Sequence, residues 1–334
     1  MSPLLLNLIL FVAGFALLTG GAEFLVRGAS RLALRLDVSP VVIGLTVVAF
    51  GTSLPELLVS LIANLEGGTA AELAIGNVVG SNIANLALIL GIVAVLRVIQ
   101  LERQLMKREY PLMLLVSVIF VYFAADGQIN RAEGLMLMAG LLGFTYFSYT
   151  LSRELPLEEQ SEVLEYVEES LDGEAAVRPA FWNLGLVTVG IVGLVTGANW
   201  LVDSAQFIAR YFGVSELVIG LTVVALGTSL PELATSVVAI LRKEGDIAVG
   251  NLVGSNLFNM LAIIGITATV RPLPAPTHML RVDFPVMLLV AVLPLVLALP
   301  KPHLMNRWKG LILLVIYFAY NFWLFNSGYV PVTP

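Results

Sequence analysis

Apolar stretches of about 20 residues recur along the whole chain, and this recurrence limits the fold more than any other feature. A helix of about 20 apolar residues can cross the hydrocarbon core of a bilayer, which is roughly 30 Å thick. The composition agrees, because 58% of the residues are hydrophobic and only 13% are charged. A soluble domain of this size needs more charge on its surface. The chain is therefore predicted to be an all-α integral membrane protein.

Hydropathy predicts ten transmembrane helices. They cover residues 4–27, 40–64, 72–96, 110–125, 134–151, 182–209, 216–241, 247–270, 283–299 and 309–326. Of the Lys and Arg residues, 14 fall in the odd-numbered connections between these helices and 4 in the even-numbered ones. Because cytoplasmic loops carry the excess of positive charge, the odd connections are predicted to be cytoplasmic. Both termini are then expected outside a cell membrane, which the chain crosses many times.

The rest of the composition excludes several classes of protein. The chain has no cysteine, so neither disulfides nor thiolate metal sites are possible. Its two histidines lie in polar connections, which disfavours a histidine metal centre, and no cofactor is expected. Nine of the 24 acidic residues lie between Glu154 and Glu174, and the remainder of the chain is near neutral. No basic patch therefore indicates nucleic acid. The N-terminal segment lacks a basic region and is interpreted as a retained helix.

The sequence repeats itself. Residues 42–57 (VIGLTVVAFGTSLPEL) and 218–233 (VIGLTVVALGTSLPEL) are identical at fifteen of sixteen positions. A second block, GNVVGSNIAN at 76–85, recurs as GNLVGSNLFN at 250–259. Each half contains five predicted helices, and since five is odd, the second half must cross the membrane in the opposite sense. The prediction is two inverted repeats, residues 1–151 and 181–334, joined by an acidic cytoplasmic linker at 152–180, with an ion site at the midplane.

Glu56 and Glu232 each lie deep inside an apolar span, within the repeated GTSLPE motif. A carboxylate at that depth costs at least ~2.5 kcal/mol on insertion scales, which indicates a functional role. A buried carboxylate held only by backbone donors is the structural alternative. Pro55 and Pro231 lack an N–H, so nearby carbonyls lose their helical partners and become available to a cation.

The second block supplies further oxygen ligands. Ser81 and Asn85 are one helical turn apart, as are Ser255 and Asn259. Carboxylate, hydroxyl, amide and carbonyl oxygens suit hard cations such as Ca2+ and Na+. The glycine pairs of the two blocks are predicted to let helices approach closely. For the remaining asparagines, packing and capping are as plausible as ion binding; they are Asn77, Asn82, Asn251 and Asn256. In the first helix, the spacing of Glu23 and Arg27 predicts a local ion pair.

The paired GTSLPE and GSN blocks resemble the α-repeats of the cation/calcium exchanger superfamily, and the chain is most similar to its short prokaryotic sodium/calcium exchangers. The resemblance implies alternating access, with Na+ and Ca2+ as substrates, and movement of the first and sixth helices past a fixed core. It implies that Glu56 and Glu232 bind Ca2+, with the backbone carbonyls of Thr52 and Thr228. It further implies a set of flanking Na+ ligands: the carbonyls of Ala49 and Ala225, with Ser53, Ser81, Ser229 and Ser255. Asn85 and Asn259 match the central polar position of each repeat.

Some relatives, including K+-dependent exchangers, carry Asp where this chain has Asn259, so its centre is less acidic than theirs. A Ca2+/H+ antiporter of the same superfamily is the main alternative, because it would use the same glutamates. A hydrolase with a serine nucleophile would need a base, and no His or Lys lies within the predicted spans. A passive channel fits inverted repeats with broken helices less well than alternating access does. Protein partners are not indicated by the sequence.

Overall fold

The computed structural model describes residues 2–36, 38–152, 180–213 and 227–326, and within these ranges the chain is almost entirely helical. The elements of the first half are α1 (Pro3–Arg35), α2 (Pro40–Ile43), η1 (Gly44–Val48), α3 (Ala49–Thr52), α4 (Leu54–Glu66), α5 (Thr69–Ile83), η2 (Ala84–Ile89), α6 (Leu90–Leu96), β1 (Ile99–Gln100), η3 (Leu105–Glu109), α7 (Tyr110–Ala124), β2 (Gln128–Ile129) and α8 (Arg131–Ser152). Those of the second half are α10 (Ala180–Tyr211), α13 (Leu230–Leu241), α14 (Gly245–Phe258), η6 (Asn259–Ile263), α15 (Ile264–Val270), β3 (Leu273–Pro274), α16 (Thr277–Arg281), α17 (Asp283–Ala298), β4 (Leu304–Met305) and α18 (Arg307–Asn326). Segments labelled η are π-helical.

Five helices within the described ranges are long and apolar enough to cross a membrane, and the bent pair 40–52 and 54–66 would make a sixth. The chain is thus an all-helical, multi-pass membrane protein. The count falls short of ten partly because α13 has only 12 residues, since most of the preceding segment lies outside the described part of the chain. Charged residues in η3 also interrupt the apolar run that continues into α7. The prediction of ten spans stays a prediction.

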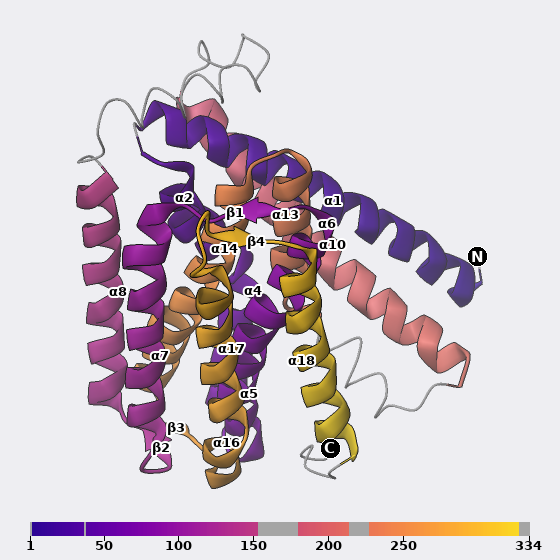
Figure 1. Ribbon diagram of the computed structural model, residues 1–334. Coiled ribbons are helices and arrows are strands. Elements are labelled where there is room, and N and C mark those ends of the chain that lie inside the picture. The colour runs from indigo at the N-terminus through magenta and orange to yellow at the C-terminus, as the bar shows by residue number, and fades with distance from the viewer. Residues whose placement is uncertain (1, 37, 153–179, 214–226, 327–334) are drawn as a thin grey trace.

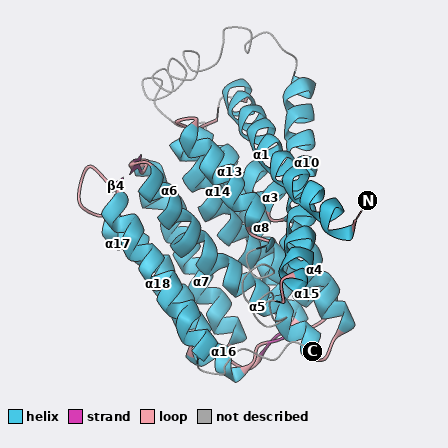
Figure 2. Cartoon of the chain, turned by 90° about the vertical axis from the view of Figure 1, so that its right-hand side faces the viewer, coloured by secondary structure: helices cyan, strands magenta, loops and turns pink. Residues whose placement is uncertain are grey.

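The longest helices, α1 and α10, lie side by side and cross the remaining helices obliquely (Figures 1 and 2). Their contact is lined by glycines seven residues apart, which are Gly14, Gly21 and Gly28 on α1 and Gly190 and Gly197 on α10. A Cβ on Gly21 would lie 2.6 Å from a backbone nitrogen of α10. The two backbones therefore touch, as small residues permit between membrane helices.

Both GTSLPE motifs break a helix. The segment from α2 to α3 and the following α4 are bent by 47° to one another. The break falls at Ser53, whose φ and ψ are −87° and 7°, and Pro55 follows within the first turn of α4. Ser229 has nearly the same backbone angles, −87° and 5°, and Pro231 opens α13 in the same way. The predicted interruption is confirmed at Pro55, and the described part of the second motif has the same backbone angles before Pro231.

Two short antiparallel ladders join the two halves of the chain. Strand β1 pairs with β4, and β2 pairs with β3. Figure 1 shows these ladders at opposite ends of the upright helices. The first ladder joins two of the predicted odd-numbered connections, and the second joins two even-numbered ones. Of the predicted linker at 152–180, residues 153–179 lie outside the described part of the chain.

Candidate cation site

The two broken helices bring the motif glutamates into the interior. Glu56 in the first turn of α4 and Glu232 in the first turn of α13 are each 1% exposed. The hydroxyl of Ser53 donates a hydrogen bond of 3.1 Å to Glu232 Oε1, so the break of one half reaches the carboxylate of the other. Two acidic groups far apart in sequence thus share one buried region.

Each GTSLPE break is held by the second block of the opposite half. Thr52 Oγ1 donates to Asn251 Oδ1 on α14, over 3.2 Å. In the matching contact, Thr228 Oγ1 donates to Asn77 Oδ1 on α5, over 3.4 Å. The two asparagines are fixed in turn by serines, since Asn77 donates to Ser60 and Asn251 donates to Ser236. These two contacts of each half therefore have their equivalents in the other half.

The second blocks also bond directly to each other. Asn85 Nδ2 donates to Asn256 Oδ1, and Asn259 Nδ2 donates to Asn82 Oδ1, both over 3.0 Å. Asn85 lies in π-helical segment η2, and Asn259 begins η6. Single π-helical turns occur often at functional sites. The amide nitrogens of Asn85 and Asn259 are thus engaged as donors. Their side-chain oxygens accept no hydrogen bond from the described residues and remain available as acceptors.

Five buried side-chain oxygens of these residues have no hydrogen-bond partner among the described residues. They are both carboxylate oxygens of Glu56, Oε2 of Glu232, and Oδ1 of Asn85 and Asn259. An unpartnered buried acceptor costs about 1–3 kcal/mol, and more when it is charged. Acceptor oxygens gathered without donors are the arrangement that a hard cation satisfies.

The structure places eleven of the twelve sequence-predicted site residues. Ten are buried: Ala49, Thr52, Ser53, Glu56, Ser81, Asn85, Ser229, Glu232, Ser255 and Asn259. Thr228 is half-buried, and Ala225 lies outside the described residues. Hydroxyl contacts of 3.5 Å join Thr52 to Ser255 and Ser229 to Ser81. The predicted residues are therefore neighbours in space.

The sequence left the role of four asparagines open, and the structure gives each one a contact with a predicted site residue. Asn77 and Asn251 bond the threonines of the breaks, while Asn82 and Asn256 bond the central asparagines. Ser60 and Ser236 were not singled out by sequence reasoning. The sequence contains a pattern that could have identified them, because a serine follows the motif glutamate by four residues in each half.

Close helix approach at the second blocks is confirmed for one half. A Cβ on Gly250 would lie 2.7 Å from the carbonyl oxygen of Val41, and one on Gly254 would lie 2.5 Å from that of Leu45. For Gly76 and Gly80 no atom of the described residues lies within 4 Å of such a Cβ. The residues of the second half that correspond to Val41 and Leu45 fall within 214–226, outside the described part of the chain.

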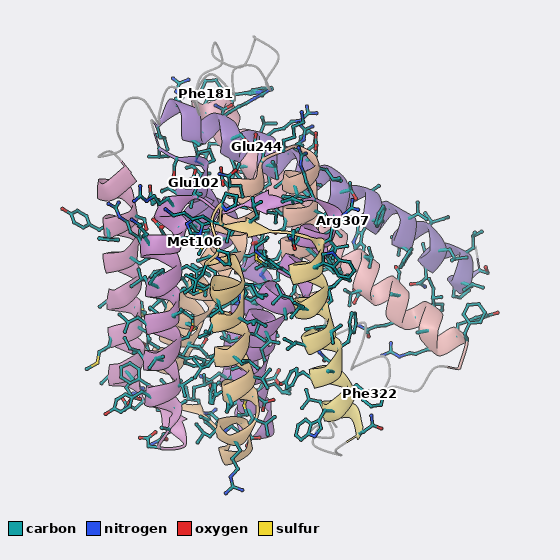
Figure 3. The ribbon with its side chains drawn as sticks, in the orientation of Figure 1. Glu102, Met106, Phe181, Glu244, Arg307 and Phe322 are labelled. Carbon is teal, nitrogen blue, oxygen red and sulfur yellow. The ribbon has the colours of Figure 1, made fainter. Side chains whose placement is uncertain are left out.

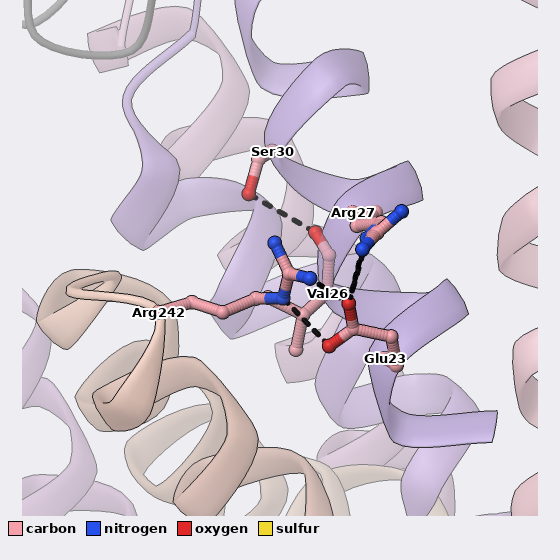
Figure 4. A network of polar contacts seen from close by, with 5 residues as sticks. All are labelled: Glu23, Val26, Arg27, Ser30 and Arg242. Carbon is pink, nitrogen blue, oxygen red and sulfur yellow. Dashed lines mark hydrogen bonds and ion pairs between the residues drawn. The ribbon is translucent and has the colours of Figure 1, made fainter. Parts of the chain in front are cut away.

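A second polar network lies between α1 and the end of α13 (Figure 4). Glu23 pairs with Arg27 at 2.7 Å, which confirms the predicted ion pair, and it also pairs with Arg242. One turn further along α1, the hydroxyl of Ser30 donates to Glu244 over 3.1 Å. The network ties α1 to the connection between α13 and α14 and contains none of the predicted cation ligands.

Within the described ranges, no group of three or more His, Cys, Asp or Glu residues could hold a metal ion. Any cation bound between Glu56 and Glu232 would therefore depend on hydroxyl, amide and carbonyl oxygens for its remaining ligands. Oxygen sites of this kind serve ions that enter and leave, in contrast to the closed nitrogen and sulfur cages of structural zinc.

An all-helical membrane bundle with broken helices and buried polar groups at its centre defines the class of membrane transporters. The comparisons identify the family within that class. The chain belongs to the sodium/calcium exchanger protein family, which it matches over residues 6–150 and again over residues 182–326. The protein is therefore a member of a family of membrane exchangers, which is not a family of enzymes.

Relatives match over nearly their whole length. A candidate antiporter named CaxA from Alkalimonas amylolytica is 37% identical over 326 residues, which cover 97% of this chain and 100% of CaxA. Inner membrane protein YrbG of Escherichia coli strain K12 is 36% identical over 324 residues, or 96% of this chain and 98% of YrbG. Sodium/calcium exchanger MaX1 of Methanosarcina acetivorans is 32% identical over 347 residues, or 94% of this chain and 97% of MaX1.

Solved structures of the sodium-calcium exchanger NCX_Mj share the fold. The structure of NCX_Mj soaked with zero Na+ and Ca2+ matches this chain with a TM-score of 0.80 at 30% sequence identity. The match covers 95% of this chain and 98% of NCX_Mj. Other structures of that exchanger were soaked with Na+, Ca2+ or Sr2+, and they match equally well.

Proposed function

We propose that this protein exchanges Na+ for Ca2+ by alternating access, with the ions bound between the two broken helices. In this proposal Glu56 and Glu232 supply the charge that Ca2+ requires. The carbonyls of Thr52 and Thr228 complete the Ca2+ site. The residues proposed to line the flanking Na+ sites and the centre are Ala49, Ala225, Ser53, Ser81, Ser229, Ser255, Asn85 and Asn259.

One observation carries the proposal: three of the four buried carboxylate oxygens of Glu56 and Glu232, and the side-chain oxygens of Asn85 and Asn259, have no hydrogen-bond donor among the described residues. Two full negative charges in a buried place are unfavourable unless they are neutralised. One Ca2+ balances both carboxylates, and Ca2+ takes six to eight oxygen ligands. Na+ can use the same oxygens, so binding of one ion excludes the other, which is the physical basis of exchange.

Coupling to Na+ is favoured over coupling to H+ by the buried hydroxyls. Ser53 donates to the carboxylate of Glu232, and the hydroxyls of Thr52 and Ser255 contact each other beside the same break. A proton would need only the carboxylate, whereas Na+ needs several oxygens around it. The relatives MaX1 and NCX_Mj are named as sodium/calcium exchangers, which agrees with this preference. A Ca2+/H+ antiporter remains the alternative, since the name of CaxA states only antiport.

The proposal includes ten spans in two inverted five-helix repeats, residues 1–151 and 181–334, joined by the linker 152–180. The paired contacts support it. Strand β3 follows β1 by 174 residues and β4 follows β2 by 176, yet β1 pairs with β4 and β2 with β3, at opposite ends of the molecule. The family match also occurs twice, once in each half. A two-fold relation between oppositely oriented halves produces this swapped pairing.

We further propose that the protein lies in the cell membrane, with both termini outside and the linker in the cytoplasm. The 14 basic residues of the odd-numbered connections support this orientation. The β1–β4 ladder agrees, because it joins two of those connections at one end of the molecule.

The test is uptake of 45Ca2+ into proteoliposomes under an imposed Na+, K+ or H+ gradient, with voltage clamped. We expect uptake to follow the Na+ gradient and to persist without K+, because Asn259 leaves the centre without a third carboxylate. Uptake that follows only the pH gradient would establish the Ca2+/H+ alternative. Glu56→Gln and Glu232→Gln should each abolish uptake in a folded protein, and normal flux in either variant would remove the proposed site.

A further inference from the structure

A second feature of the molecule lies away from the cation site. A cavity of about 810 Å³ follows the line between α7 and α8, which stand side by side in Figure 1. Its outer walls are exposed apolar side chains, including Leu115 on α7 and Met136 on α8, and its floor includes the buried Phe144 and Leu261. The cavity is therefore an elongated apolar groove that opens onto the apolar outer surface of the bundle.

The groove is apolar along its length and basic at one end. Lys107 and Arg108 line it where η3 leads into α7, and both side chains are exposed. Met106, which precedes them, is labelled at the upper end of α7 in Figure 3. No hydrogen bond or ion pair joins either basic side chain to another described residue. Glu109, the neighbouring carboxylate, is buried and accepts a hydrogen bond from Gln104.

The dimensions suit one extended chain. The lining residues of η3 and α7 run from Lys107 to Phe123, which corresponds to a rise of roughly 24 Å along a helix. One leaflet of a bilayer has about half of the roughly 30 Å hydrocarbon thickness, so an acyl chain lying along the groove would be covered over its whole length.

We propose that this groove binds one anionic phospholipid from the surrounding bilayer, with an acyl chain along the groove and the headgroup phosphate against Lys107 and Arg108. The amphiphile matches both the apolar walls and the basic end. Basic pockets between transmembrane helices on the cytoplasmic side bind anionic headgroups, and the connection that holds these residues is the most basic of the odd-numbered ones. A partner helix would not explain the basic pair at one end of an otherwise apolar groove.

The lipid would contact the centre of the molecule through one residue. Leu261 in the floor belongs to η6, the π-helical segment that begins with Asn259. Gly140 allows Leu261 to pack closely against α8, because a Cβ at position 140 would lie 3.1 Å from the Leu261 side chain. The occupant of the groove therefore rests on the same short segment that carries one of the central asparagines.

Native mass spectrometry of the full-length protein tests the proposal without reference to any transported ion. Purified protein is mixed with equal amounts of phosphatidylglycerol and phosphatidylcholine, and the retained lipids are counted. We expect retention of phosphatidylglycerol to exceed that of phosphatidylcholine, and Lys107→Gln with Arg108→Gln to weaken it by roughly tenfold or more. The control, Lys301→Gln with Arg307→Gln, changes two exposed basic residues outside the groove and should leave retention unchanged.

A second pair of variants tests the groove itself. Gly143 lines the groove, and a Cβ there would meet no described atom within 4 Å, so Gly143→Phe should fill the space and prevent lipid retention. Gly185→Phe is the matched control, at an exposed glycine of α10 with equally open surroundings. Unchanged retention in both the charge variant and Gly143→Phe would overturn the proposal. So would equal retention of the two lipids, or a doubled mass that Gly143→Phe abolishes, because a second copy of the chain would then occupy the groove.

Discussion

The glycine-lined contact between α1 and α10 yields a prediction that can be worked out from the structure. A Cβ on Gly21 would lie 2.6 Å from the nitrogen of Leu194 and 2.8 Å from the oxygen of Gly190, whereas ordinary contact begins at 3.4 Å. Both neighbours are backbone atoms, which cannot rotate away. Gly21→Ala must therefore separate the two helices by about 0.8 Å at this point, the difference between 2.6 and 3.4 Å.

A separation of this size has a calculable cost. A gap of 0.5–1 Å forfeits about a quarter to a half of the dispersion attraction of the atoms that face it. Overpacking of a tight interface typically destabilises by about 1–3 kcal/mol. We therefore expect Gly21→Ala to melt at a clearly lower temperature than the unmodified protein, as measured by fluorescence-detected size exclusion after heating.

The neighbouring glycine provides the control. A Cβ on Gly20 would meet nothing within 4 Å. Alanine favours helix over glycine by about 1 kcal/mol, so Gly20→Ala should be neutral or slightly stabilising. Equal melting of the Gly20→Ala and Gly21→Ala proteins would refute the reasoning, because the two substitutions differ only in the helix face on which the methyl group is placed.

Three further results are expected. Asn82→Ala removes the acceptor for the Asn259 amide and should lower the apparent Ca2+ affinity in flux assays by roughly tenfold, with both site glutamates still present. Arg242→Gln breaks a partly exposed ion pair between the end of α13 and α1, so the free energy of unfolding should fall by no more than about 1 kcal/mol. A larger loss would mean that the network holds α1 in place. An impermeant thiol reagent on intact cells should label a cysteine introduced at Ser2 and miss one at Ser161, and the reverse pattern would overturn the proposed orientation.

Local chemistry explains why part of this site could be predicted from the sequence. Proline cannot donate a backbone hydrogen bond, so the breaks before Pro55 and Pro231 follow from the motif alone. The burial of Glu56 and Glu232 likewise follows from their position inside apolar spans. These features depend on residues within about one helical turn, and the structure agrees with them at both repeats.

The sequence did not predict how the two halves bond to each other. The contacts from Asn85 to Asn256 and from Ser53 to Glu232 join residues more than 170 positions apart. They depend on the relative placement of helices, which repeat similarity alone does not define. The π-helical turns at η2 and η6 were also missed, because a one-residue shift in hydrogen bonding leaves no distinct pattern in an apolar run.

The two strand ladders have a mechanical consequence. Strands β1 and β4 fasten the connection after α6 to the one after α17, and β2 and β3 fasten the connection after α7 to the one after α15. Helices α7 and α17, together with the two ladders, therefore form a closed ring with one ladder at each end. Within the described residues neither ladder includes α1 or α10. Because the ring is closed at both ends, α7 and α17 are expected to keep their spacing when helices outside the ring move, and α1 and α10 are two of those helices.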